Sequence, residues 1–393
     1  MKKTGAQIIV KLLEMHGIKT VAGIPGGSIL PLYDELTRSS IHHVLVRQEQ
    51  AGGFIAQGMT RTTGLPAVCL ATSGPGAMNL LTAVADARCD SVPIIAITGQ
   101  VNTNLIGTDA FQEADTFGLS FPITKHSVMI KSHAELFTAI PQAFEIAMNG
   151  RPGPVLIDVP RNIQLTEYEF ESWPEIKKPL PDEKSVRFHT KSSAIKAIIE
   201  QAAEMLSASV KPCLYIGGGC NSPEAAKALR NFKKAYRLPV VSSLMGLGAI
   251  PHSDADFAGM VGMHGTKASN MAVTESDLVL ALGARFSDRV ISDASRFAQN
   301  SRVFHIDVDP AEINKNIPVA GSLVGDVGEI LKRLLPLIKQ NTHTEWRTQI
   351  EEWKKVYPPV YDEKPSDSIN PKFLCECIRE ISGPDTFITT EVG

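Results

Sequence analysis

The feature of the sequence that most constrains its fold is an alternation of short apolar runs with helical periods. Between residues 4 and 160, runs rich in β-branched residues are separated by segments whose apolar residues recur about every three or four positions. The runs expected to form strands cover residues 20–24, 42–46, 66–72, 92–98 and 153–159. This alternation predicts a parallel sheet covered by helices on both faces, with ligand-binding loops after the strands.

A second series of the same kind follows a Pro-rich, charged stretch at 166–190, which we interpret as a linker. Its expected helices are 192–207, 222–236 and 327–339, and its expected strands are 213–217, 238–243, 277–284 and 302–309. A second linker is expected at 341–370, followed by a helix over 370–381 and a strand over 386–393. We therefore predict an α/β protein with two doubly wound parallel-sheet domains, 1–165 and 191–340, and the start of a third at 371–393.

Composition narrows the class of protein. The chain has 393 residues, 43% of them hydrophobic and 21% charged, and a net charge of −3, so it has no basic footprint for nucleic acid. Its first helix should begin after Thr4 and end near Gly17, and Lys11 interrupts any secretory leader. No apolar run is long enough for a membrane span, and the six cysteines lack metal-ligand spacing. We expect a cytoplasmic protein with reduced thiols.

Several motifs follow the strands of the first series. Residues 23–27 (GIPGG) and 72–76 (TSGPG) are glycine-rich turns, and the second opens a helix that carries Asn79. Neither motif is a P-loop or a GxGxxG fingerprint. The long polar loop 99–115 contains Gln112, which is either functional or merely solvated. Glu49 begins a helix rich in small residues, so it is either a helix-dipole glutamate or a carboxyl placed where little water reaches.

The second series also carries polar and glycine motifs at strand ends. They include three glycines at 217–219, His264 between glycines, two arginines within 282–289, and two aspartates within 305–310. Together they suit a dinucleotide, with arginines on the phosphates and Asp307 on a ribose. The order of the motifs departs from the Rossmann fingerprint, so an NAD dehydrogenase is not indicated.

In this order the motifs resemble the catalytic large subunit of acetolactate synthase (acetohydroxyacid synthase), a thiamine-diphosphate (ThDP) enzyme family. The segments that carry the resemblance run along the whole chain: GIPGGSILPLYD, RQEQAGGFIAQGM, TSGPGAMNLLTA, GTDAFQEAD, GRPGPVLIDVP, SLMGLG, GMHGT, GARFSDR and GDV. The resemblance implies that the first domain binds the ThDP pyrimidine and that the Rossmann-like middle domain binds FAD, which the family does not use for net redox chemistry.

The resemblance also implies roles for single residues. Glu49 and Gln112 would be catalytic. Glu49 would share a proton with N1′ of the ThDP aminopyrimidine, so that the exocyclic nitrogen can remove the C2 proton, and desolvation would favour the protonated carboxyl. Gln112 would donate to a substrate oxygen. Residues expected to contact ThDP are Pro25, Gly26, Glu49, Pro75, Asn79 and Gln112.

Substrate and FAD contacts follow from the same resemblance. Phe111, Arg161, Met263 and Arg289 would bind substrate, with Arg289 on the carboxylate of the second keto acid. The residues expected to contact FAD are Arg151, Gly217, Gly218, Gly219, Ser243, Leu244, Gly262, Met263, His264, Gly283, Ala284, Arg285, Asp307, Gly325 and Asp326.

The sequence departs from the family pattern in three places. Arg161 replaces a usual lysine, and Ser287 replaces a common acid. No Gly-Asp-Gly motif for the cofactor diphosphate and Mg²⁺ occurs. We therefore expect no metal ligands in this chain and a cut before the diphosphate-binding domain. On this expectation the 393 residues bind FAD but make no acetolactate by themselves.

The function implied by the resemblance is ThDP-dependent decarboxylation of pyruvate and carboligation to a second 2-keto acid, giving 2-acetolactate or, with 2-ketobutyrate, 2-aceto-2-hydroxybutyrate. This is a step of branched-chain amino-acid biosynthesis. A homodimer or tetramer with the active site between chains is expected, with a possible small regulatory subunit. The alternatives are another ThDP enzyme, of the pyruvate oxidase or sulfoacetaldehyde acetyltransferase type, or a truncated, non-catalytic FAD-binding partner.

Overall fold

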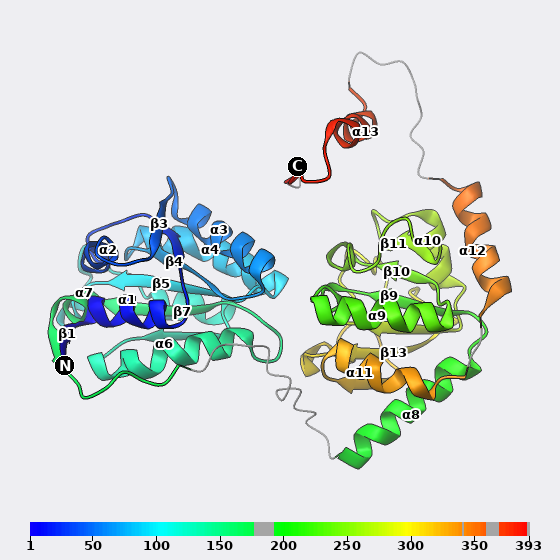
Figure 1. The fold of residues 1–393 in the computed structure, drawn as a ribbon, viewed down its shortest axis with the longest axis horizontal. Helices are drawn as coiled ribbons and strands as arrows, with labels where there is room; N and C mark the ends of the chain where they lie inside the picture. The colour runs from blue at the N-terminus through cyan, green and yellow to red at the C-terminus, as the bar shows by residue number, and fades with distance from the viewer. Residues whose placement is uncertain (177–191, 340–341, 359–368, 391–393) are drawn as a thin grey trace. The chain divides into compact units, whose positions relative to one another are not determined.

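The computed structural model describes residues 1–176, 192–339, 342–358 and 369–390 of the chain. The chain forms two compact units, Met1–Lys191 with Val308–Pro310, and Ser192–Asp307 with Ala311–Gly393 (Figure 1). Each unit is built on a six-stranded sheet whose neighbouring strands are all parallel. The predicted α/β fold with two parallel-sheet domains is therefore confirmed.

The first unit has the sheet order β3-β2-β4-β5-β7-β6. Its elements are β1 (Lys2–Thr4), α1 (Gly5–Met15), β2 (Thr20–Gly23), α2 (Leu30–Leu36), β3 (His42–Leu45), α3 (Glu49–Thr63), β4 (Ala67–Ala71), α4 (Pro75–Asp90), β5 (Ile94–Gln100), α5 (Thr116–Ser120), β6 (His126–Met129), α6 (His133–Met148), β7 (Val155–Pro160), α7 (Arg161–Leu165) and β8 (Glu167–Glu169). All five predicted strands are present. The edge strand β6 and the short antiparallel pair of β1 with β8 were not predicted.

The central strands of this sheet face two separate cores. Val68 and Leu70 of β4 pack into the core under α1 and α6, whereas Cys69 of the same strand packs into the core under α3 and α4. Successive side chains of a strand point to opposite faces, so a strand that is apolar throughout can fill both cores. This explains the unbroken apolar runs of the sequence.

The boundaries of α1 follow local capping chemistry. The Thr4 hydroxyl accepts a hydrogen bond from the Gln7 backbone N–H at 3.2 Å, and the Gln7 side chain accepts one from the Thr4 N–H at 3.2 Å. Gly17 follows the last turn with φ +79°, a left-handed conformation that glycine adopts without a steric cost. The predicted start and stop of this helix are confirmed.

The second unit has the sheet order β11-β10-β9-β12-β13-β14. Its elements are α8 (Ser192–Ala208), β9 (Pro212–Ile216), α9 (Pro223–Tyr236), β10 (Val240–Ser242), β11 (Phe257–Met260), α10 (Lys267–Thr274), β12 (Leu278–Leu282), β13 (Arg302–Asp307), β14 (Gly321–Val324), α11 (Val327–Leu334), α12 (Thr344–Val356) and α13 (Pro371–Ile381). Helix α11 contacts both α8 and α9, and α10 contacts α12 (Figure 1). Helix α11 ends earlier than predicted because Pro336 lies in the next turn.

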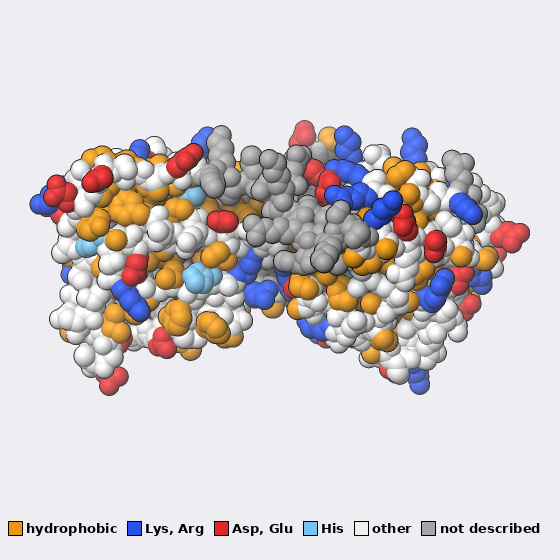
Figure 2. Space-filling view, turned by 90° about the horizontal axis from the view of Figure 1, so that it is seen from below, with side chains coloured by type: hydrophobic (Ala, Val, Ile, Leu, Met, Phe, Trp, Pro, Cys, Tyr) orange, Lys and Arg blue, Asp and Glu red, His pale blue; other side chains and the backbone are white. Residues whose placement is uncertain are grey.

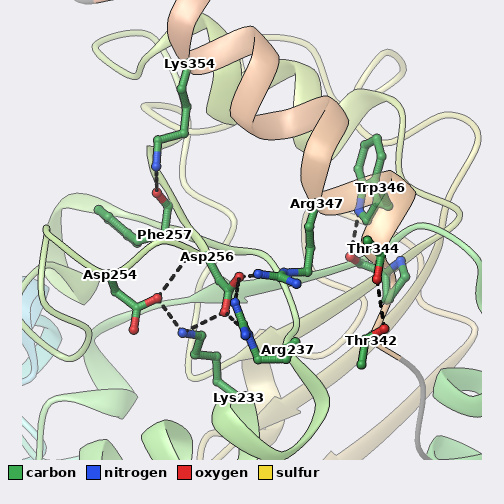
Figure 3. Close-up of polar contacts among 11 residues, drawn as sticks. Lys233, Arg237, Asp254, Asp256, Phe257, Thr342, Thr344, Trp346, Arg347 and Lys354 are labelled. Carbon is green, nitrogen blue, oxygen red and sulfur yellow. Dashed lines mark hydrogen bonds and ion pairs between the residues drawn. The ribbon is translucent and has the colours of Figure 1, made fainter.

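The structure differs from the sequence-based expectation at the second linker. Residues 344–356 form helix α12, and its Trp346 and Ile350 are buried in the core of the second unit. The Trp346 indole N–H donates to the backbone oxygen of Pro212 at 3.0 Å (Figure 3). The expectation of a linker is therefore wrong for this segment, while 359–368 lie outside the described residues.

Two further expectations, one about the first linker and one about the last predicted strand, are corrected. At the first linker, β8 pairs with β1, and Phe170 and Trp173 pack against Phe137, so this stretch belongs to the first unit. Residues 177–190 lie outside the described part. Residues 386–390 form no strand, although 386–393 were predicted to do so, and they pair with no strand in the described part of the chain.

The charged surface, the cysteines and the helices can be compared with what the composition predicts. Lys and Arg side chains are interspersed with Asp and Glu on the face shown in Figure 2. The six cysteines, all of them in the described part of the chain, form no disulfide. Among the described helices, none combines the length and the apolar character that crossing a membrane requires.

Candidate functional site

The first group of predicted site residues meets where the strand order of the first unit reverses. Strand β2 lies between β3 and β4, so the turns after β2 and β4 open side by side at the carboxyl edge of the sheet. Ligands bind at such switch points in open α/β sheets. We call the group formed there by Gly26, Glu49, Gly76, Asn79 and Gln112 the Glu49 cluster.

Glu49 is the first residue of α3, and Asn79 lies in the first turns of α4. The Asn79 amide nitrogen donates to Glu49 Oε2 at 3.0 Å. A Cβ on Gly76 would lie 3.2 Å from Glu49 Oε1, so glycine leaves room for the carboxylate. Helix α3 approaches the backbone of β2 closely at Gly52, where a Cβ would lie 3.2 Å from the Ala22 oxygen. The Glu49 side chain is half-buried rather than enclosed.

Gln112 reaches this cluster through its backbone. Gly74, the residue before α4, has φ +58° and ψ −125°, and a Cβ there would lie only 2.7 Å from the Gln112 oxygen. Gln112 itself has φ +58°. A left-handed conformation is uncommon for a residue with a side chain and is found where the surroundings impose it. The polar loop 101–115 is thus seated against the turn that opens α4.

Two residues of this region were missed by sequence reasoning. A Cβ on either Gly26 or Gly76 would lie 2.6 Å from the Thr72 side chain, so Thr72 packs between the two glycine turns. Among the described residues no hydrogen-bond partner reaches the buried Tyr33 hydroxyl, and burial, Cys69 and Glu49 all raise the Tyr33 pKa. Thr72 is the first residue of the TSGPG motif, which was a usable signal, whereas Tyr33 had none.

A buried carboxyl lies below the loop that carries Gln112. Asp158 of β7 accepts hydrogen bonds from Thr98 Oγ1 at 2.7 Å and from Gln100 Nε2 at 2.9 Å. Burial raises the pKa of Asp158 to about 7, against the lowering effect of these two bonds. Gln100 Nε2 also donates to the Ala114 oxygen at 2.9 Å. This network ties the end of the loop to the sheet.

Three other predicted residues of this unit lie in exposed positions. Pro25 lies in the turn after β2, and Arg161 is the first residue of α7, directly after β7. Phe111 is 89% exposed at the tip of the loop. All three follow strands at the carboxyl edge of the sheet. Arg151 lies instead at the opposite edge of this sheet, where its Nε donates to Ser91 Oγ at 2.8 Å, so it is not part of the Glu49 cluster.

The second group lies at the carboxyl ends of the strands of the second unit, and we call it the strand-end cluster. Its centre is the switch point between β9 and β12. A Cβ on Gly217 would lie 2.2 Å from the Gly283 oxygen, and the Gly219 N–H donates to that oxygen at 3.1 Å. Side chains at these positions would separate the two turns. Their packing explains the glycine run that the sequence shows.

The remaining predicted FAD residues of this unit follow the other strands. Ser243 and Leu244 follow β10, Asp307 is the buried last residue of β13, and Gly325 and Asp326 follow β14. The Gly325 N–H donates to the Asp307 oxygen at 2.9 Å. Asp326 caps α11 by accepting from the Glu329 N–H at 2.9 Å. Gly218 lies in the turn after β9, and Ala284 and Arg285 follow β12.

Met263 and Arg289 are brought together by their backbones. The Met263 N–H donates to the Arg289 oxygen at 2.9 Å, next to Gly262, which has φ +111°. The Arg289 side chain is 70% exposed and lies 3.6 Å from Asp288. His264 is exposed in the following turn. Gly262 and Met263 also line an open pocket of about 360 Å³ between α10 and residues 290–298.

Sequence reasoning missed Asn270, which holds this turn. Its Oδ1 accepts from the Gly262 N–H at 2.8 Å, and its Nδ2 donates to the Gly262 oxygen at 3.1 Å. An asparagine inside a helix carries no sequence signal for such a role. The pair of bonds fixes the backbone that presents Met263.

The family resemblance implies three bound groups, ThDP, FAD and Mg²⁺, and the residues present fit the first two. The Glu49 cluster offers a carboxylate beside a side-chain-free surface at Gly76, which suits a flat nitrogen-containing ring. The strand-end cluster offers close backbone turns, and its Ser242 Oγ is buried without a hydrogen-bond partner among the described residues. For Mg²⁺, no group of three or more His, Cys, Asp or Glu side chains suited to a metal is found in the described part.

Comparison with known proteins identifies both units. Residues 3–119 match the family described as thiamine pyrophosphate enzyme, N-terminal TPP binding domain, and residues 199–334 match its central domain. Thiamine pyrophosphate is the same compound as thiamine diphosphate.

Whole proteins are also similar to the chain. It is 44% identical over 396 residues to the acetolactate synthase isozyme 1 large subunit of Escherichia coli K12, covering 99% of this chain and 67% of that protein. It is 44% identical to the acetolactate synthase large subunit of Corynebacterium glutamicum, covering 100% and 62%. It is 43% identical to isozyme 2 of Escherichia coli K12, covering 99% and 68%. The chain thus spans between 62% and 68% of the length of these relatives. The chain belongs to the acetolactate synthase large-subunit family of thiamine pyrophosphate enzymes.

Proposed function

We propose that these residues form the pyrimidine-binding and flavin-binding parts of an acetolactate synthase that joins pyruvate to a second 2-keto acid. The products are 2-acetolactate with pyruvate and 2-aceto-2-hydroxybutyrate with 2-ketobutyrate, as branched-chain amino-acid biosynthesis requires. The observation that carries the proposal is the Asn79–Glu49 hydrogen bond at the switch point, with Gln112 seated on the adjoining turn. The names and the identity of the relatives support the same activity.

Bound ThDP would supply a nucleophilic carbon that attacks a keto acid and stabilises the charge left when CO₂ departs. Glu49 acts as the acid–base residue: Asn79 orients its Oε2, which leaves Oε1 facing Gly76 as the atom that holds or releases a proton. The Gln112 amide would donate a hydrogen bond to a substrate oxygen. Both groups come from different strand ends, so the sheet sets their spacing.

Arg289 would bind the carboxylate of the second keto acid. Its guanidinium is a planar fork that matches a carboxylate, and its exposed side chain is paired only weakly with Asp288. Met263, on the neighbouring turn, would provide an apolar wall. Phe111 and Arg161 are the substrate contacts that we propose from the first unit.

FAD would occupy the strand-end cluster, where the close turns at Gly217–Gly219 and Gly283 admit a diphosphate-bearing ligand. The proposed FAD contacts are Arg151 and the residues of the second unit expected from the sequence. In the proposed reaction FAD has a structural role, because decarboxylation and carboligation need no net oxidant.

Assembly is part of the proposal. Exposed apolar side chains lie on the segments that carry or neighbour the Glu49 cluster in the chain: Leu45 ends β3, Phe54 lies on α3, Phe111 precedes Gln112, and Phe121 follows α5. Such a surface marks an interaction site, and it suits a homodimer or tetramer with the active site between chains. The relatives are named large subunits, which supports a small regulatory subunit as a partner. We place the protein in the cytoplasm, where thiols stay reduced, because its cysteines form no disulfide in the described part of the chain.

The test uses a chimera in which residues 1–393 are joined to the part of the Escherichia coli isozyme 1 large subunit outside the matched region. Purified chimera receives carbon-13 pyruvate, ThDP, Mg²⁺, FAD and inorganic phosphate in air. A parallel sample receives sulfoacetaldehyde in place of pyruvate, and products of both are followed by NMR. Labelled acetolactate supports the proposal. Acetyl phosphate as the main product would favour a pyruvate oxidase, and acetyl transfer from sulfoacetaldehyde would favour that transferase.

Flavin binding is tested on the 393-residue chain itself. Titration with FAD should quench flavin fluorescence in a saturable manner, and Gly283→Val should abolish the quenching because its side chain would meet Gly219. Gly58→Val is the matched control, since Gly58 has open space around it and lies on α3. Equal binding by both variants would contradict the assignment of the strand-end cluster.

A further inference from the structure

The loop that carries Gln112 folds around a carboxylate that the proposed reaction does not use. Glu113 follows Gln112 directly, and its two oxygens accept hydrogen bonds from the backbone N–H groups of Gly107 and Ala110, the latter at 3.0 Å. The Glu113 N–H in turn donates to the Ala110 oxygen at 2.9 Å. Backbone N–H groups of one short loop that converge on a single anion form a concave site of the kind called a nest, which holds a negative charge firmly.

The nest needs an unusual backbone. Gly107, Asp109 and Gln112 all have positive φ, between +58° and +82°. Asp109 and Gln112 carry side chains, for which this region is unfavourable. A segment of seven residues with three left-handed positions does not keep this shape by local preference. The carboxylate at its centre is the group that binds both halves of the segment together.

The shape matters because it places Gln112. The backbone of Gln112 rests against Gly74, the residue that opens α4 beside the Glu49 cluster. Both ends of the loop are fixed independently of Glu113. At its start, Asn162 accepts from the Thr103 N–H at 2.9 Å, and at its end, Gln100 donates to the Ala114 oxygen. Between these anchors, the Glu113 contacts bind the 107–110 half of the turn to the half that holds Gln112.

We propose that Glu113 is a positioning residue for Gln112: its charged carboxylate, held by the N–H groups of residues 107 and 110, keeps Gln112 in its left-handed conformation against the Gly74 turn. The proposal rests on the proposed function only for the role of Gln112. The two hydrogen bonds from residues 107 and 110 to the Glu113 carboxylate, which we call the clasp, are a property of the chain itself. Hydrogen bonds from Gly107 and Ala110 lower the Glu113 pKa, which agrees with a carboxylate that stays ionised in the nest.

The sign of the pH dependence follows from that direction. A carboxyl with a lowered folded pKa contributes stability above its ordinary value, about 4.3 for glutamate, and loses it as the pH falls through the lower folded value. The other charged groups along the loop are Asp109, whose side chain is exposed, and Asp115, which caps α5 through the Gly118 N–H. The clasp should therefore hold throughout pH 5 to 8 and open only in stronger acid.

The experiment compares three variants of the 393-residue chain by hydrogen–deuterium exchange of peptides spanning residues 105–114. Glu113→Gln removes the charge and replaces one acceptor oxygen by a donor. Glu113→Asp keeps the charge but shortens the reach. Asp109→Asn is the matched control, because it removes a charge from the same loop at a carboxylate that accepts no hydrogen bond among the described residues. Exchange of buried β5 reports whether a variant is folded.

In Glu113→Gln, we expect the amide hydrogens of residues 107 and 110 to exchange faster by roughly tenfold or more. In Glu113→Asp, their exchange rates should lie between those of Glu113→Gln and those of the unchanged chain. Asp109→Asn should match the unchanged chain. The unchanged chain should lose its protection in acid, and Glu113→Gln should lack this pH profile. If Glu113→Gln also exposes β5, the graded effect of Glu113→Asp decides the question.

A second readout reports the position of Gln112 directly. With selectively labelled glycine and glutamine, a nuclear Overhauser contact between the α-protons of Gly74 and Gln112 is expected in the unchanged chain and in Asp109→Asn, and should vanish in Glu113→Gln. Protection and contact that survive in Glu113→Gln would overturn the proposal while leaving acetolactate synthesis untouched. A chimera without acetolactate synthesis would refute the proposed function and leave the clasp standing.

Discussion

Helix α12 is held on the second unit by a buried ion cluster, and Arg347→Ala should release it. Arg347 Nε donates to Asp256 Oδ1 at 2.6 Å, and Asp256 also binds Lys233 at 2.8 Å and Arg237 at 3.0 Å (Figure 3). The Asp256 side chain is 2% exposed. A second contact, from Lys354 Nζ to the Phe257 oxygen at 2.9 Å, lies further along the helix.

The geometry sets the size of the effect. A hydrogen bond to a charged group contributes about 1.5–3 kcal/mol, and Arg347 is only 22% exposed, so Arg347→Ala should cost an amount in that range. Asp256→Asn should cost more, about 3–5 kcal/mol, because it leaves three cations without their buried carboxylate. Lys355→Ala is the matched control: its pair with Glu351 is exposed and 3.8 Å long, which is worth at most about 0.5 kcal/mol.

Tryptophan fluorescence reports this docking. The chain has three tryptophans, and Trp346 and Trp353 lie on α12 with ring centroids 5.6 Å apart. In a Trp173→Phe background, urea titration should therefore follow α12 and the core beneath it. With a slope of about 1–3 kcal/mol per molar urea, Arg347→Ala should lower the midpoint by roughly 1 M.

The pH dependence provides an independent check. Burial would raise the pKa of Asp256, but hydrogen bonds from Arg237, Lys233 and Arg347 lower it to about 2. Stability from this carboxylate is thus present above its ordinary value of about 3.9 and is lost as the pH falls toward 2, so docking should not change between pH 5 and 8. Transitions of Arg347→Ala and Asp256→Asn that coincide with that of Lys355→Ala would refute this reasoning.

Three further predictions concern the candidate site. In the chimera, Glu49→Gln should slow deuterium exchange at the reactive carbon of bound ThDP by ~10²–10⁴-fold, measured by NMR, and an unchanged rate would exclude its acid–base role. Arg289→Ala should spare decarboxylation but raise acetaldehyde relative to acetolactate, whereas an unchanged product ratio would exclude its role in binding the second keto acid. Burial raises the pKa of Asp158 to about 7, so its contribution is complete below the ordinary value and is lost as the pH rises through 7. The free energy of unfolding of the unchanged chain should therefore fall between pH 5 and pH 8.5, whereas that of Asp158→Asn should not. At about 1.4 kcal/mol per unit of pKa, the difference between the two proteins should change by a few kcal/mol over this range in urea titrations. Equal pH profiles would contradict this.

The central strands were predictable from sequence, and the edge strands largely were not. The three strands of the parallel sheets that were missed, β6, β11 and β14, are all at sheet edges. A central strand of a parallel sheet is buried on both faces and reads as a continuous apolar run, as in residues 94–97. An edge strand such as Gly321–Val324 is short and partly exposed, so its sequence resembles a loop.

Helix α12 was missed for a different reason. Trp346, Ile350 and Trp353 recur at helical spacing and face the core, so a short apolar stripe was present in the sequence. Its polar remainder and the Pro-rich stretch that follows concealed the pattern. The converse error concerns residues 386–390, whose β-branched composition favours a strand. A strand forms only with a neighbour to pair with, and composition does not report one.

The candidate site shows which of its residues can be predicted from the sequence and which cannot. Glu49, Asn79 and the glycine turns follow strands, and in a parallel sheet all strand ends meet at one edge, so their convergence follows from topology. The residues that set their exact arrangement are of another kind. Thr72 acts through packing between two turns, Asn270 through both bonds to one glycine, and Glu113 through backbone N–H groups of its own loop. Each role depends on a backbone path that residue types do not encode one at a time. Motifs therefore locate the chemistry, whereas the residues that hold it in place emerge only from the geometry.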